Sequence, residues 1–167
     1  VTAADRETVL QRAEQLSAVL QKRVGAGELA AFESPSRYLP SAMTQRARQA
    51  SLPTPVELET RLAEALEGLP LRAHRLAPFV EDIARARNQP LLQAADLAQT
   101  SMAMALDALL LPRGTQWSAL LPLTAPAGAD INADRIRAAL TEARVAEALF
   151  VDLKTESHSM YAGYLQE

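Results

Sequence analysis

The sequence contains no cysteine. This absence excludes thiol catalysis, cysteine-ligated zinc and disulfide bonds, and it leaves the compartment open because cysteine-free chains occur in both oxidising and reducing environments. Aromatic residues make up only 4% of the chain, whereas 49% of it is hydrophobic, mainly Leu and Ala. This mixture favours helices over strands. A chain of 167 residues can bury one core without covalent cross-links.

Long apolar runs and dense positive charge are also missing. No stretch approaches the roughly 18 uncharged apolar residues that span a bilayer, and the first residues do not form a signal peptide. The net charge is −3, and no lysine-rich or arginine-rich face stands out. A general nucleic-acid binder needs such a cationic face, so we expect no nucleic-acid partner. Because the chain begins without Met and ends without a stop signal, we expect a water-soluble piece of a longer protein.

The signatures of common enzymes are absent too. The chain has no G-x-S-x-G elbow, no glycine-rich phosphate loop and no H-E-x-x-H motif. Neither His74 nor His158 has the partner four residues away that a helix-borne metal site needs. Glu156, Ser157 and His158 offer an acid, a hydroxyl and an imidazole, but neighbours on a helix diverge and cannot form a relay. We therefore predict no catalysis, no metal and no cofactor.

Residues 1–34 read as a helix followed by a strand. Asp5 is a suitable N-cap, and apolar residues then recur at steps of three and four, which predicts one buried helix face. Those positions are Val9, Ala13, Leu16, Leu20 and Val24. A short apolar run at residues 29–32 predicts a strand after the helix. Residues 1–2 fit the end of a preceding strand, whose remainder would lie upstream.

Residues 41–99 read as a helical block set off by prolines. Ser41 fits the cap of a short helix, and Thr54 and Glu57 form a capping box with Pro55 at the first helical position. The expected buried positions of the second helix are Leu58, Leu62, Ala65 and Leu66. A third helix begins at Pro78 with Phe79, Ile83 and Ala86 inward, and residues 91–99 fit a further short helix.

Residues 100–167 return to a mixed pattern. Residues 109–111 fit either a helix end or a hairpin arm, a turn follows at 112–115, and residues 117–123 predict a strand. Residues 130–132 cap a helix with Ile136, Ala139, Leu140 and Ala143 buried, and residues 148–151 predict another strand. A last helix is expected at 155–167, where Tyr161 and Tyr164 either approach a membrane interface or pack on the sheet.

Two strand–helix–strand units separated by helices predict a helix-rich α+β fold. We expect a small split βαβ, ferredoxin-like sheet of porter type with an all-α insertion between its halves. The whole chain would form one domain, made of a first αβ unit (1–34), the helical insertion (41–99) and a second βαβ unit with the C-terminal helix (100–167).

Three arginines stand in a segment that has no acid between Glu33 and Glu57: Arg37, Arg46 and Arg48. Arg46 and Arg48 are two positions apart, so on a helix they diverge. One hypothesis is that the three contact an anionic lipid headgroup or an acidic partner, each contributing about 1 kcal/mol near a membrane surface. The alternative is pairing with the acids at residues 57–67.

Several pieces of the sequence, in order, resemble the predicted exporters of the RND superfamily, MMPL-like branch. The likeness runs from about Asp5 to the last residue. It includes the runs SRYLPS at 36–41, WSALLPL at 117–123 and VDLKTES at 151–157. The motif residues that carry it include Leu39, Pro40, Ser41, Gln45, Leu52, Pro53, Trp117, Asp152 and Glu156.

This resemblance implies an extracytoplasmic loop domain, on the periplasmic side of an inner-membrane exporter. Its partners would be the transmembrane part of its own chain, the other extracytoplasmic domain and a hydrophobic or lipid-like cargo that it binds or guides. Similar proteins use proton-relay acids in membrane helices, so this domain would not catalyse a reaction and would move with those helices. The alternative is a free-standing periplasmic or cytoplasmic adaptor that recognises a protein or lipid.

Overall fold

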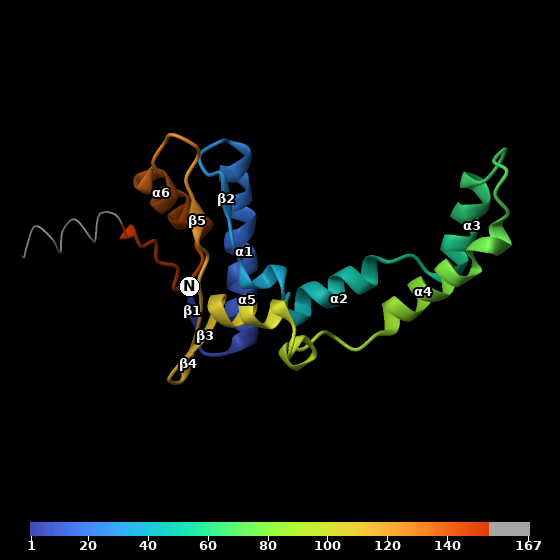
Figure 1. Ribbon diagram of the computed structural model, residues 1–167, viewed down its shortest axis with the longest axis horizontal. Coiled ribbons are helices and arrows are strands. Elements are labelled where there is room, and N and C mark those ends of the chain that lie inside the picture. The colour runs from blue at the N-terminus through green and yellow to red at the C-terminus, as the bar shows by residue number, and fades with distance from the viewer. Residues whose placement is uncertain (154–167) are drawn as a thin grey trace, which may run out of the picture. The chain divides into compact units, whose positions relative to one another are not determined.

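The computed structural model of the chain describes residues 1–153. These residues form a helix-rich α+β structure with a few short strands, as expected from composition (Figure 1). Contacts divide the chain into two compact units. We call Val1–Ser41, together with the chain from Leu97 onward, the sheet unit, and Ala42–Asp96 the helical unit.

The first long helix of the sheet unit is α1, Arg6–Gly25. Asp5 caps it, as predicted, because its carboxylate accepts a hydrogen bond from the Thr8 backbone N–H at 2.8 Å. The helix ends before Gly27, whose φ of 73° is a conformation that other residues rarely adopt. The predicted apolar face is confirmed for Val9, Ala13, Leu16 and Leu20, which are buried together with Leu10, whereas Val24 is half-buried.

Three short strands form an antiparallel sheet in the order β1-β4-β3. They are β1 (Thr2–Ala3), β3 (Leu110–Arg113) and β4 (Gln116–Ala119). Ser118 lies opposite Thr2 on one side and Leu111 on the other. The sheet therefore joins the start of the chain to a segment more than a hundred residues later. The sequence left residues 109–111 as either a helix end or a hairpin arm, and the structure shows both. Helix α5 (Ser101–Leu109) ends at Leu109, and β3 begins at the next residue.

The strand predicted at residues 117–123 is divided into two. After β4 the chain changes partners: β5 (Leu123–Thr124) pairs with β2 (Ala31–Phe32) in a separate antiparallel ribbon. Pro122 lies at the break, and proline has no N–H to give to a ladder. Its carbonyl instead accepts from the Glu33 N–H at 2.9 Å.

Helix α6 (Ala133–Ala143) completes the core of the sheet unit. Asn132 caps it by accepting from the Arg135 N–H at 3.0 Å. Ile136, which is 1% exposed, packs in a buried cluster with Leu20, Leu29 and Phe32. The core thus joins α1, β2 and α6, which come from opposite parts of the chain.

The strand predicted at residues 148–151 is wrong, because this segment has irregular backbone. Arg144 and Glu147 both have positive φ, 51° and 57°, and so turn the chain repeatedly after α6. Leu149 is 78% exposed, so the apolar run that predicted a strand is not buried there. One backbone hydrogen bond, from Thr2 N–H to Glu147 O at 3.3 Å, brings this segment beside β1.

The helical unit contains three α-helices and short 3-10 turns. The helices are α2 (Ala42–Ser51), α3 (Pro55–Ala65) and α4 (Ala77–Asn88). The turns are η2 (Ala73–Leu76) and η3 (Ala94–Leu97). The last residue of η3, Leu97, is the first residue of the second segment of the sheet unit. The capping box of Thr54 and Glu57 is confirmed. Helix α4 packs against both α2 and α3.

Burial in the helical unit is less than predicted. Of its side chains that the structure describes, only Leu58 is buried, at 8% exposure. Leu62 and Leu66 are half-buried, whereas Ala65 and Phe79 are exposed, because α4 and the turn η2 cover α3 only in part. The helix predicted at 91–99 is only the 3-10 turn η3, since Gln99 has a φ of 64° and Pro90 precedes it.

Candidate functional site

The connector that leaves β2 is anchored to α1. The carboxylate of Glu14 accepts two hydrogen bonds from Ser41, one from its backbone N–H at 2.8 Å and one from its hydroxyl at 2.7 Å. Ser17 donates its hydroxyl to Ala13 O at 2.7 Å and also lies within hydrogen-bonding distance of the Ser34 hydroxyl. Ser34 and Ser41 are both fully buried. The segment is therefore a fixed connector, as its prolines indicated, and not an open loop.

Arg37 lies on this connector, in the 3-10 turn η1 (Pro35–Arg37). Its guanidinium lies 5.0 Å from the centre of the Phe32 ring and 3.5 Å from the Glu33 carboxylate. Glu33, rather than an acid at residues 57–67, is thus its partner. The side chain remains 48% exposed, so the pair with Glu33 is a weak surface interaction.

Arg46 and Arg48 lie in the helical unit, both exposed on α2. Neither forms an ion pair with any residue of the range 1–153, so the expected pairing with acids at 57–67 does not occur there. Their spacing of two residues directs them to different sides of the helix. These two arginines remain available to an anionic ligand, but they do not converge on one.

Several of the motif residues that resemble the exporters form hydrogen bonds between segments that are far apart in the sequence. The Gln45 side chain bonds the backbone of Leu92 twice, accepting from its N–H at 2.7 Å and donating to its carbonyl at 3.1 Å. The Leu52 carbonyl accepts from the Arg87 guanidinium. Ser41 is held by Glu14, as described above. These residues therefore have structural roles that explain their presence without a ligand.

The remaining motif residues are spread over the chain. Leu39 is buried, at 3% exposure. Trp117 is on β4, with the Arg6 guanidinium 5.9 Å from its ring centre. Pro53 precedes α3, and Asp152 follows the irregular segment after α6. Glu156 lies outside the described residues, as do Ser157, His158 and the predicted last helix.

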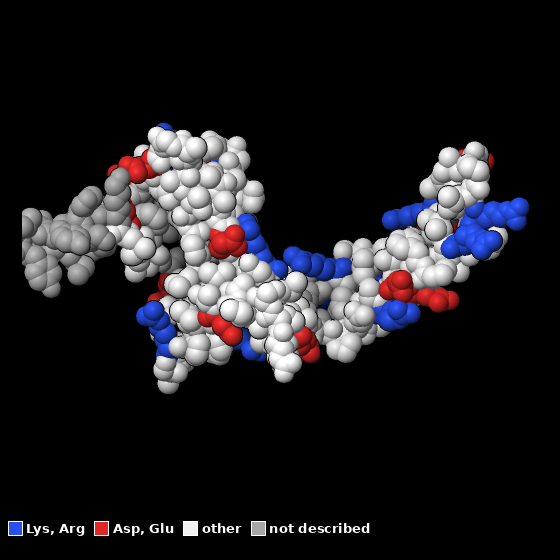
Figure 2. Space-filling view, viewed as in Figure 1, with Lys and Arg blue, Asp and Glu red and all other residues white. Residues whose placement is uncertain are grey.

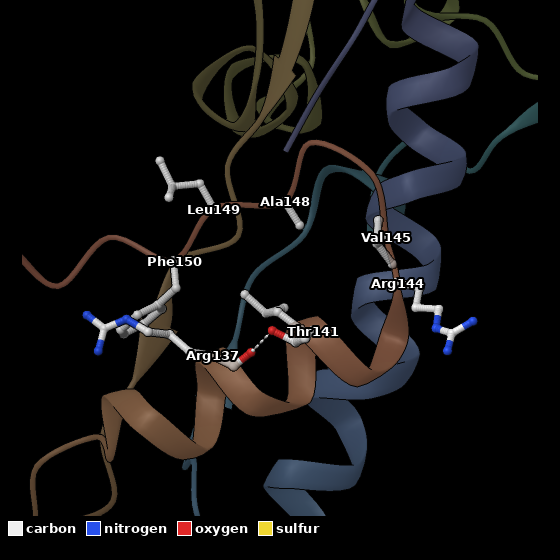
Figure 3. A pocket seen from close by; sticks show the side chains of 8 residues that line it. Arg137, Thr141, Arg144, Val145, Ala148, Leu149 and Phe150 are labelled. Atoms are coloured by element: carbon white, nitrogen blue, oxygen red, sulfur yellow. Dashed lines mark hydrogen bonds between the residues drawn. The ribbon is translucent and has the colours of Figure 1, made fainter.

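A hollow of about 360 Å³ lies beside α6 (Figure 3). Leu140, Val145, Ala148 and Phe150 give it apolar walls. Arg137 is at its rim, but its guanidinium is already engaged, 5.5 Å from the Phe150 ring centre and 3.2 Å from the Asp134 carboxylate. Thr141 and Arg144 also line it, so the hollow has both polar and apolar walls. Sequence reasoning missed it because residues 148–150, which form one side of its lining, were assigned to a strand.

A candidate contact surface lies on the helical unit. Its exposed large apolar side chains are Met43, Val56, Leu69, Leu71, Phe79 and Leu92. Three of them, Leu69, Leu71 and Phe79, fall in the connection between α3 and α4 and the start of α4. Cationic side chains gather over the same part of this unit in Figure 2, where Figure 1 draws the bend between α3 and α4. Large exposed apolar side chains close together indicate an interaction surface.

The titratable groups of the described residues whose pKa values are shifted are Asp5, Glu57 and the Val1 amino group. No cluster of three potential metal ligands occurs among residues 1–153. Hydrogen bonds from Thr8 lower the pKa of Asp5, and those from Thr54 lower the pKa of Glu57, but both carboxylates serve helix caps. The pKa of the Val1 amino group is lowered mainly by burial and further by nearby Arg12. None of these groups lines the hollow beside α6.

No protein family, curated protein or solved structure matches this chain. Within residues 1–153, none of the helices is both long enough and apolar enough to cross a bilayer.

Proposed function

We propose that this chain is an extracytoplasmic, porter-like loop domain of an MMPL-like exporter of the RND superfamily. In this role it binds or guides a hydrophobic or lipid-like cargo, has no turnover of its own and moves with the membrane helices of its parent protein. The proposal rests first on the ordered sequence likeness. Its main structural support is the sheet unit, in which strands from both sides of a helical segment pair directly.

A split βαβ arrangement is part of this proposal. β1 and β2, on either side of α1, run antiparallel to successive parts of the segment 116–124 and hence share one direction. After α6, the bond from Thr2 N–H to Glu147 O brings the chain back to the free side of β1. The proposal predicts that this bond is kept in the intact exporter, seen as slow amide exchange at Thr2.

The helical unit supplies the surface for contact in this proposal. A domain that guides an apolar cargo needs exposed apolar side chains on a fixed scaffold, and the helical unit presents six large ones. Arg46 and Arg48 are candidates for an anionic headgroup or an acidic partner, since neither is paired within residues 1–153. Arg37, already engaged with Phe32 and Glu33, is a weaker candidate.

The parent gene gives the first test. A hydrophobic stretch of about 20 residues is expected within roughly 20 residues of each side of this chain. Polar flanks on both sides would reject the exporter proposal, and a complete reading frame near this length would favour the free-standing adaptor.

The intact exporter gives the second test, by cargo efflux from cells. The Arg46→Gln/Arg48→Gln variant is expected to lower efflux while leaving protein abundance in the membrane unchanged. Gln21→Ala, a change at an exposed position of α1, serves as the control. Unchanged efflux in the double variant would remove both arginines from the proposed contact surface.

A further inference from the structure

The connection between α3 and α4 combines exposed apolar and cationic side chains. Leu69 is 57% exposed, Leu71 52% and Phe79 46%. Arg72 and Arg75 lie between these apolar residues in the sequence, and both are exposed. No acid occurs from Gly68 to Val80. We call residues 68–80 the apolar-cationic tip.

The backbone keeps these side chains outside any core. Gly68, with a φ of 77°, turns the chain after α3, and Pro70 prevents the helix from continuing. The chain then makes the 3-10 turn η2, which the Arg75 N–H closes by donating to Arg72 O at 2.9 Å. Pro78, in the first turn of α4, starts the next helix. Two rigid boundaries thus hold a short apolar segment at the end of a helix pair.

The two arginines are not neutralised within the described part of the chain. Ion pairs there join Arg23 to Glu28, Arg37 to Glu33, Arg85 to Asp82, Arg135 to Glu28 and Arg137 to Asp134, and none includes Arg72 or Arg75. The nearest acids along the chain, Glu67 and Glu81, lie just outside the tip at both of its ends. The tip therefore combines a local positive charge with apolar side chains that are each about half exposed.

We infer that the apolar-cationic tip docks on the surface of a bilayer that contains anionic phospholipid. The exposed Leu and Phe side chains enter the boundary between headgroups and acyl chains, and the arginines bind lipid phosphates. A protein partner that matched this surface would need an apolar pocket and acidic groups at once, whereas an anionic membrane surface offers both over its whole area. This inference concerns the side chains of the tip alone and does not depend on the exporter proposal.

Co-sedimentation of the 167-residue chain with vesicles tests the inference. Vesicles of phosphatidylcholine with about one third phosphatidylglycerol are expected to bind the chain more tightly than pure phosphatidylcholine, with the difference reduced by salt. Arg72→Gln/Arg75→Gln is expected to lower the partition coefficient on anionic vesicles about 30-fold, at about fivefold for each arginine. Leu69→Ser and Leu71→Ser are each expected to lower it about tenfold.

Matched controls separate the tip from general charge and hydrophobicity. Arg113→Gln/Arg144→Gln removes two exposed arginines from the sheet unit and is expected to change binding less than about threefold. Met104→Ser removes an apolar side chain that is 76% exposed on α5, in the sheet unit, and should have a similarly small effect. Circular dichroism confirms the fold of each variant.

A tryptophan at the tip reports insertion directly. In a Trp117→Phe background, which removes the single native tryptophan, Phe79→Trp is expected to shift its emission to shorter wavelength and to be quenched by brominated acyl chains when anionic vesicles are added. Absence of binding to anionic vesicles would overturn the inference, as would equal losses in the tip and control variants. Binding to an immobilised acidic polypeptide with no binding to vesicles would also overturn it, and would assign the tip to a protein partner.

Discussion

The two units of this chain differ in how they use apolar residues. The sheet unit buries a cluster of them where α1, β2 and α6 meet, in which Leu20, Leu29, Phe32 and Ile136 are each at most 4% exposed. It exposes others, such as Met104 and Leu149, around this core. The helical unit leaves its apolar residues outside, with Leu58 alone buried among its described side chains. Because burial of apolar area is the main favourable term in folding, stability must come mostly from the sheet unit. The helical unit is free to offer its apolar side chains to something else.

Polar bonds compensate in part for the missing core of the helical unit. Gln45 bonds the Leu92 backbone, Gln49 donates to Gln89 O at 2.8 Å, and Arg87 donates to Leu52 O. Such bonds fix geometry but contribute only about 1 kcal/mol each, since water competes for the same groups. The unit is therefore expected to keep its shape in the native state and to open at low free-energy cost.

The largest effect is expected from a cavity in the core of the sheet unit. Ile136→Ala should lower the free energy of unfolding by about 3 kcal/mol, because the side chain is almost fully buried in the cluster. Urea unfolding followed by Trp117 fluorescence measures this, since the single tryptophan reports on β4. Val56→Ala, at a 73% exposed position of the helical unit, should change it by less than about 0.5 kcal/mol. Equal losses in both variants would contradict the difference between the units.

The next effect concerns the anchor of the connector on α1. Glu14→Ala should lower the free energy of unfolding by about 2 kcal/mol, because it leaves the buried N–H and hydroxyl of Ser41 without their carboxylate. Gln15→Ala, at the adjacent exposed position of α1, is the control in the same urea titration. A loss no greater than that of the control would show that the carboxylate does not anchor the connector.

A smaller effect sharpens the comparison by acting on the helical unit alone. Thr54→Ala removes the capping box of α3 and should destabilise that helix by about 1 kcal/mol. If the helical unit opens independently, the variant loses helical circular dichroism at lower urea while the Trp117 transition stays in place. A Trp117 transition that moves by the full amount would mean that the two units unfold together.

The smallest effect is a pH dependence at the start of α1. Hydrogen bonds from Thr8 lower the pKa of Asp5 below its usual value of 3.8 in the folded chain. The carboxylate therefore adds stability above pH 3.8, and this contribution declines as the pH falls through the lower folded-state pKa. The stability difference between the native chain and Asp5→Asn, which keeps a capping side chain, should decrease over this acidic range. A difference independent of pH would contradict the account of the cap.

Local signals predicted the helices better than the strands. Asp5, Asn132 and the capping box at Thr54 act through hydrogen bonds to residues three positions away, so the sequence alone carries them. The division of 117–123 depends on β2, which lies far away in the sequence, and the irregular path after α6 depends on the positive φ values of Arg144 and Glu147. The spacing of apolar residues along the chain shows neither a distant pairing partner nor a positive φ value.

The candidate surfaces show the same limit. The apolar stripe of α3 predicted burial because helical periodicity assumes a neighbour on that face, but α4 covers only part of it. Likewise, the local excess of arginine predicted a shared role for Arg37, Arg46 and Arg48, although Arg37 is engaged with Phe32 and Glu33. Spacing identifies an amphipathic face, but the number of neighbours decides whether that face is core or surface.

Hydrogen exchange of the 167-residue chain, resolved by peptide mass, tests most directly the claim that one unit supplies the stability and the other the surface. The account predicts slow exchange with a common high free energy for α1, β4 and α6, and faster exchange for α2, α3 and α4, which should open together without the sheet unit. Equal protection across both units, lost in a single step as denaturant is raised, would contradict it.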